Sequence, residues 1–90
     1  MKDFINETLS NGDRLFLSHL TSSTHHPWGT PSHFSKEQYF SQDGSTLWHQ
    51  DMDDYLNTIR YVDLWLGNVL KLLRESGIAN ETLIVLAGDQ

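Results

Sequence analysis

The 90-residue sequence predicts an α/β fold in which a long loop and one long amphipathic helix connect two parallel strands. Two short apolar runs, residues 14–20 and 82–87, are typical of buried strands. Between them, apolar residues recur at helical spacing over residues 52–76. A strand, a connection that contains a helix and a second strand form a βαβ unit, whose strands run parallel.

The first expected strand lies between a turn and a long loop. Residues 1–13 are polar and end in an Asn-Gly-Asp sequence, a strong turn signal. After the strand, residues 21–50 are rich in Ser, Thr, His, Gly and Pro and show no periodicity. Compact domains rarely contain a loop of this length unless it is functional. We therefore expect the loop to form part of a site.

The helix is expected over residues 52–76. Asp51 or Asp53 can cap its N-terminus, and Gly77 suits the left-handed position just past its end. Gly67, inside the helix, indicates close packing against a neighbouring element. The apolar stripe comprises Tyr55, Leu56, Ile59, Val62, Leu66, Val69, Leu70 and Leu73.

Composition limits the partners of the chain. The formal net charge of −6 argues against a nucleic-acid partner. The chain has no cysteine and no apolar run of about 18 residues, so any membrane attachment would come from segments outside these residues. Two Asn-x-Thr triplets, at residues 6–8 and 80–82, would accept glycans only in the secretory pathway. The oligomeric state is left open.

The predicted topology brings candidate site residues to one edge of the sheet. Ligands of open parallel sheets bind outside the carboxyl ends of the strands. His25 and His26 follow the first expected strand, and Asp89 follows the second. Histidines can transfer protons, bind metals or contact anions, although most loop histidines are simply solvated. A helix cap is the competing role for Asp89.

Two stretches of the chain resemble the sulfatase family of the alkaline-phosphatase-like superfamily. FLSHL at residues 16–20 and STHHP at residues 23–27 are similar to a strand that leads into an H-x-P motif. Residues 55–89 resemble the helix, Gly-Ile turn, Asn-x-Thr-Leu stretch, buried strand and terminal aspartate that follow in that family. The resemblance covers about residues 12–90. It implies an internal fragment of an αβα-sandwich catalytic domain, in a hydrolase that acts on a sulfate ester.

The resemblance also implies residue roles. His25, the first residue of H-x-P, would be catalytic and would contact the substrate, a small-molecule or glycan sulfate ester, with His26 as a second substrate-binding candidate. Asp89 would bind a divalent metal, most often calcium. Gln90 stands where the family generally has Asn or His, so its longer side chain would have to reposition to ligate. The resemblance and the Asn-x-Thr triplets favour the secretory pathway, with an extracellular or membrane-associated location.

The motif that supplies the nucleophile of the implied reaction is not found in the sequence. Sulfatases convert a Cys or Ser into their nucleophile, and neither C-x-P-x-R nor S-x-P-x-R occurs here. The isolated chain is therefore expected to be inactive. Three alternatives stay open: a phosphoglycerol- or phosphoethanolamine-type transferase or phosphoesterase of the same superfamily, an inactive truncated remnant, and a small metal-binding module. The module would use His25, His26, His33 and His49, whose spacing matches no zinc pattern.

Overall fold

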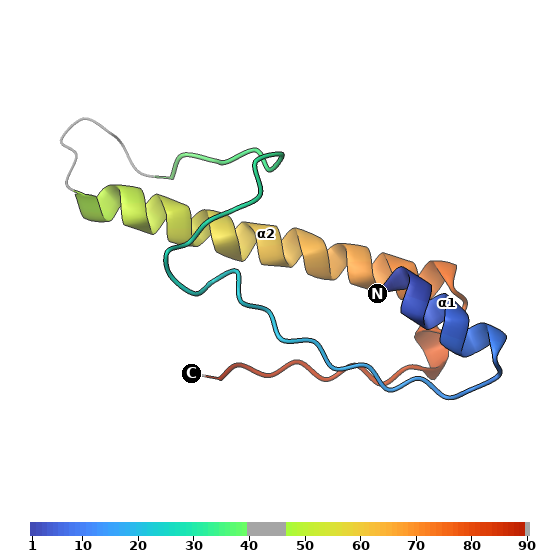
Figure 1. Ribbon diagram of the computed structural model, residues 1–90. Helices are drawn as coiled ribbons and strands as arrows, with labels where there is room; N and C mark the ends of the chain where they lie inside the picture. The colour runs from blue at the N-terminus through green and yellow to red at the C-terminus, as the bar shows by residue number, and fades with distance from the viewer. Residues whose placement is uncertain (40–46, 90) are drawn as a thin grey trace. The chain divides into compact units, whose positions relative to one another are not determined.

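The computed structural model describes residues 1–39 and 47–89. Its elements are the helix α1 (Lys2–Ser10), the helix α2 (Leu47–Glu75) and the short 3-10 helix η1 (Ala79–Glu81) (Figure 1). The chain divides into two compact units, which are described separately below. The first unit comprises Met1–Phe16 with Asn68–Gln90, and the second comprises Leu17–Gly67.

The predicted α/β fold is wrong for the part of the chain that the structure describes. No strand occurs there, so the two parallel strands and the αβα sandwich are not formed. Residues 14–20 and 82–87 are irregular, and they leave Phe16 89% and Leu83 88% exposed. The physical reason is that a strand depends on a neighbour that pairs with its backbone N–H and C=O groups. Apolar character alone does not supply that neighbour.

Helix α2 begins before the expected helix and ends close to the expected position. It starts at Leu47, so Asp51 and Asp53 lie inside it and do not cap its N-terminus. At the other end, Gly77 has a φ of 77°. The Gly77 amide donates to the Arg74 carbonyl, and the Ile78 amide donates to the Leu73 carbonyl. These two bonds define a Schellman motif, which satisfies carbonyl groups that the helix leaves unpaired.

Helix α1 was not expected from the sequence, but it ends in the same way. Its terminus is the predicted turn at residues 11–13, where Gly12 has a φ of 73°. The Gly12 amide donates to Leu9 and the Asp13 amide donates to Thr8, which is again a Schellman pattern. The buried apolar side chains of the described residues, Ile5 and Leu73, both belong to the first unit. The apolar core is therefore small.

In the second unit, α2 buries polar side chains rather than its apolar stripe. Asp53, Asn57 and Thr58 are buried, whereas Tyr55 is 36% and Ile59 41% exposed. Among the described residues no sheet is formed on which the stripe could pack. No helix described here is long and apolar enough to cross a membrane.

Alanine substitutions at two glycines of the α2 region should change the free energy of unfolding in opposite directions. The left-handed φ of Gly77 penalises any L-residue, so Gly77→Ala is expected to lower the free energy of unfolding by about 1 kcal/mol. A Cβ at Gly67 would meet no atom within 4 Å, so the expected close packing there is absent. Gly67→Ala should therefore raise stability by up to about 1 kcal/mol. Urea unfolding followed by circular dichroism tests both, and two changes of equal sign would contradict the account.

Candidate functional site

His25 lies in a compact turn of the long loop. The His25 amide donates to the Ser22 carbonyl at 3.1 Å, and the Trp28 amide donates to the His25 carbonyl at 3.2 Å. The indole Nε1 of Trp28 also donates to the Thr24 carbonyl at 3.1 Å. The turn contains a cis His26–Pro27 peptide bond, and the side chains of both histidines are exposed. The turn thus holds His25 by its backbone and leaves its ring accessible.

One hydrogen bond defines which nitrogen of His25 is free to react. Its Nδ1 lies 2.7 Å from the His26 carbonyl oxygen. Because a carbonyl can only accept, Nδ1 carries the proton in this contact, and Nε2 is then the unprotonated nitrogen of the neutral ring. An exposed Nε2 can accept a proton, and in the imidazolium form it can donate one to an anionic oxygen. This is the chemistry that a substrate-contacting histidine needs.

Aromatic rings link the turn to helix α2. The rings of His25 and His26 stack with centroids 4.3 Å apart, and the ring of His26 meets Trp28 edge-on at 6.3 Å. Trp28 in turn meets Tyr55 of α2 edge-on at 6.2 Å. Trp28 has a φ of 58°, a backbone conformation that non-glycine residues seldom adopt. The indole is therefore the side chain that connects the turn to the helix.

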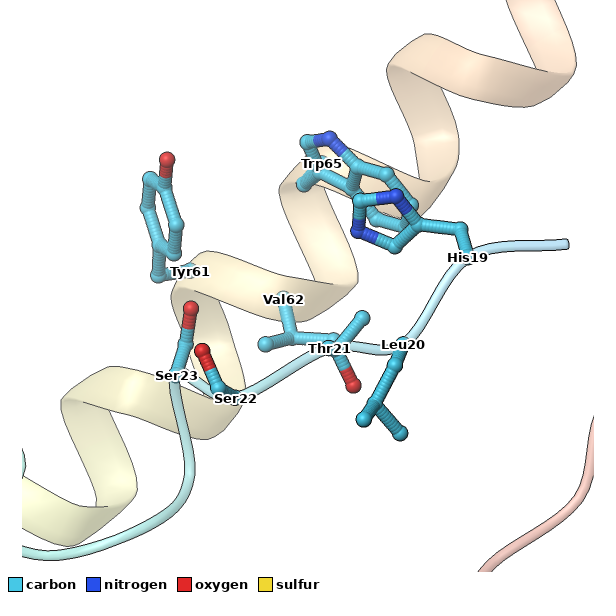
Figure 2. A pocket seen from close by; sticks show the side chains of 8 residues that line it. All are labelled: His19, Leu20, Thr21, Ser22, Ser23, Tyr61, Val62 and Trp65. Carbon is cyan, nitrogen blue, oxygen red and sulfur yellow. The ribbon is translucent and has the colours of Figure 1, made fainter.

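A hollow of about 300 Å³ lies within the same unit. Figure 2 shows the imidazole of His19 over the indole of Trp65, with centroids 4.6 Å apart. No Asp, Glu, Lys or Arg side chain lines the hollow. The lining residues are His19, Leu20, Thr21, Ser22, Ser23, Tyr61, Val62 and Trp65.

The described residues do not assemble a metal site. Asp89 is exposed in an irregular segment of the first unit, and Gln90 lies outside the described residues. Calcium takes six to eight oxygen ligands, and no group of three or more His, Cys, Asp or Glu side chains gathers within the described ranges. Asp89 by itself would leave most positions around a calcium ion to other ligands.

The predicted site residues have different outcomes in the structure. His25 and His26 come together as a stacked pair in the second unit. The sheet edge that was expected to join them to Asp89 is absent from the described residues. His33 is exposed, the side chain of His49 is not described, and no histidine cluster for a small metal module appears among the described residues.

Sequence reasoning missed Trp28, Tyr55 and Asn57 as residues that organise the loop. Trp28 packs edge-on against Tyr55. Asn57, only 1% exposed, hydrogen-bonds the backbone of Glu37. A signal for it existed, because an asparagine at a central helical position is unfavourable unless its amide is used.

Comparison with known proteins identifies one family. The model of the family described as Sulfatase matches residues 1–90, the whole chain. No curated protein and no solved structure matches the chain.

Proposed function

The chain belongs to the sulfatase family, a family of hydrolases, and we propose that it forms part of a sulfuric ester hydrolase in which His25 contacts a sulfate ester. The observation that carries this proposal is the geometry of His25. Its Nδ1 is held by the His26 carbonyl at 2.7 Å, and its ring is exposed. The free nitrogen, Nε2, is thus available to one substrate oxygen.

The proposed role of His25 is proton transfer and charge stabilisation. In the imidazolium form, Nε2–H donates a hydrogen bond to an ester oxygen. As the bond between sulfur and the leaving oxygen breaks, the proton passes from Nε2 to that oxygen, and the alcohol leaves neutral. The hydrogen bond to the His26 carbonyl keeps the other proton on Nδ1, so the neutral ring left after the transfer is the Nδ1–H tautomer. His26, stacked on His25, would make a second contact with the sulfate group.

The attacking group is not part of this proposal for the isolated chain. The sequence contains neither the cysteine nor the serine motif from which sulfatases make their nucleophile. His25 would therefore act on an ester that a nucleophile from elsewhere attacks. The substrate class that follows from the family is a small-molecule or glycan sulfate ester, and sulfatases, often secreted or lysosomal, suggest the secretory pathway as the location.

Sulfatases are generally metal-dependent, and we propose calcium as the metal, with Asp89 as one ligand and Gln90 as a neighbouring amide ligand. Because one carboxylate and one amide leave most calcium positions to water, the chain alone should bind calcium no more tightly than about 1 mM.

Calcium titration followed by the amide resonance of Asp89 measures this affinity. Asp89→Asn should abolish the response, and Asp63→Asn, at an exposed position on α2, should not. Micromolar affinity, or binding that survives Asp89→Asn, would contradict the assignment.

A titration with p-nitrophenyl sulfate tests the proposed substrate contact. In a chain labelled with ¹⁵N-histidine, the imidazole resonances of His25 should shift saturably, while those of the exposed His33 should not. Equal shifts at both histidines would show non-specific anion binding and overturn the proposal. A parallel titration with p-nitrophenyl phosphate distinguishes the esters: a stronger response to phosphate would move the function to a phosphoester enzyme of the same superfamily.

A further inference from the structure

The buried side-chain amide of Asn57, in the second unit, makes three hydrogen bonds. Asn57 is 1% exposed, although it lies in the middle of α2. Its Nδ2 donates to the Glu37 carbonyl and to the Asp53 carbonyl, each at 2.8 Å. Its Oδ1 accepts from the Glu37 amide, also at 2.8 Å. One side chain thus pairs both backbone groups of Glu37, as a neighbouring strand would.

Two further residues of α2 extend this pairing along the segment 35–39. The Asp53 carboxylate accepts from the Tyr39 amide at 2.9 Å, and the Arg60 guanidinium donates to the Ser35 carbonyl at 2.7 Å. Positions 53, 57 and 60 share one face of α2, and they meet alternate residues of the segment in reverse order. The helix rises about 10.5 Å over seven residues, and an extended chain spans about 13 Å over four. The two runs therefore stay in register.

Aromatic contacts reinforce the same end of the loop. The Phe34 ring meets Tyr61 edge-on at 5.3 Å, and the Arg60 guanidinium lies over the Phe34 ring at 4.7 Å. The ion pair between Arg60 and Glu37 has a separation of 3.8 Å and adds little, because Glu37 is exposed. Hydrogen bonds to the backbone, rather than surface charge, thus hold the segment 35–39 on α2 (Figure 1).

The loop between Trp28 and Glu37 is therefore attached to α2 at both ends. At one end, Trp28 meets Tyr55. At the other, Asn57 hydrogen-bonds Glu37. Both attachments fall within one short stretch of the helix, so residues 28–37 form a closed loop on a single rigid element. The turn that carries His25 comes directly before this loop, and the Trp28 amide hydrogen-bonds the His25 carbonyl. Releasing either attachment restores conformational freedom to that loop.

We propose that Asn57 is a positioning residue for His25. Asn57 holds Glu37 at the far end of the loop 28–37, and Trp28 at the near end then keeps the turn in which Nδ1 of His25 donates to the His26 carbonyl. Asn57 touches no substrate in this scheme and acts through the loop. The proposal rests on the proposed function only for the role of the His25 imidazole, which is to contact the sulfate ester. The coupling from Asn57 to the tautomer of His25 is argued from the geometry alone.

The experiment compares Asn57→Ala with Asn68→Ala in the ¹⁵N-histidine-labelled 90-residue chain. Alanine favours helix, so α2 should persist, as circular dichroism will show. In Asn57→Ala, hydrogen-exchange protection of the Glu37 amide should fall at least about tenfold. The fraction of His25 in the Nδ1–H tautomer should fall with it. Asn68 is exposed, and Asn68→Ala should change neither quantity.

The outcomes are separable. An unchanged His25 tautomer in a folded Asn57→Ala chain, with Glu37 exchanging freely, would overturn the proposal. If Asn57→Ala loses its helical signal, Arg60→Ala decides instead, because it removes the guanidinium contacts to Ser35, Phe34 and Glu37 but leaves Asn57 in place. It should shift the tautomer in the same direction but less, and an unchanged tautomer would overturn the proposal. A failure of His25 to respond to the sulfate ester in the unmodified chain would count against the proposed function and leave this coupling intact.

Discussion

Replacing His25 by alanine is expected to weaken the binding of p-nitrophenyl sulfate to the chain about tenfold. The reason is the loss of one charge-assisted hydrogen bond from Nε2 to a sulfate oxygen. The ring of His25 is exposed, so water competes for this bond and the effect falls at the low end of its usual range. Titration of the ester against amide resonances of residues 22–28 measures the change.

Two variants serve as references for His25→Ala. His33→Ala removes an exposed imidazole of the same loop and should leave ester affinity unchanged. His26→Ala removes the stacked neighbour but keeps the backbone carbonyl that orients His25, so it should weaken binding less than His25→Ala does. Equal losses in all three variants would indicate that the ester responds to overall charge, and the assignment of His25 would fail.

Replacing Ile5 by alanine is expected to lower the free energy of unfolding by about 3 kcal/mol. Ile5 is fully buried, and few apolar side chains of the described residues share its environment. A small core has few neighbours that can close around a cavity, so the lost contacts are not regained. Urea unfolding followed at 222 nm reports the loss through both helices.

Position 5 also offers graded controls for this loss. Ile5→Val removes one methyl group and should cost about 1 kcal/mol. Asn6→Ala changes an exposed neighbour on the same helix and should change stability by less than about 0.5 kcal/mol. If Ile5→Ala were no more damaging than Asn6→Ala, the first unit would not depend on this buried side chain for its stability.

Local features of the fold could be predicted from the sequence, because a few neighbouring residues determine them. The end of α2 follows from a glycine with a positive φ and two hydrogen bonds within six residues. The turn at residues 11–13 has the same origin. Helix α1 was missed because its nine residues are mostly polar, and only Ile5 is buried from it.

The strands could not be predicted correctly, because strand formation depends on distant partners. Residues 82–87 have the composition of a buried strand, and Thr82 has extended dihedral angles. Their apolar side chains nevertheless remain exposed, Val85 by 77%. Composition records that a segment suits a sheet; it does not record whether a sheet forms.

The candidate site shows the same division between local and distant effects. The position of His25 in an exposed, Pro-containing turn was accessible from sequence. The choice of His25 over His26 within the H-x-P register stays a prediction. The pairing of Asn57 with Glu37 joins residues 20 positions apart. A helical asparagine is most simply interpreted as a solvated side chain, so its burial was not expected. The spacing of Asp53, Asn57 and Arg60 along one face was the available signal.

The central claim is that this chain contributes a substrate-contacting histidine to a sulfatase. The most direct measurement replaces the corresponding segment of an active sulfatase catalytic domain with residues 12–90 of this chain and determines kcat/KM for p-nitrophenyl sulfate. The account predicts measurable hydrolysis, and a decrease in kcat/KM of about 100-fold when His25 is changed to alanine, with little change for His33→Ala. A folded hybrid whose activity is the same with and without His25 would contradict it.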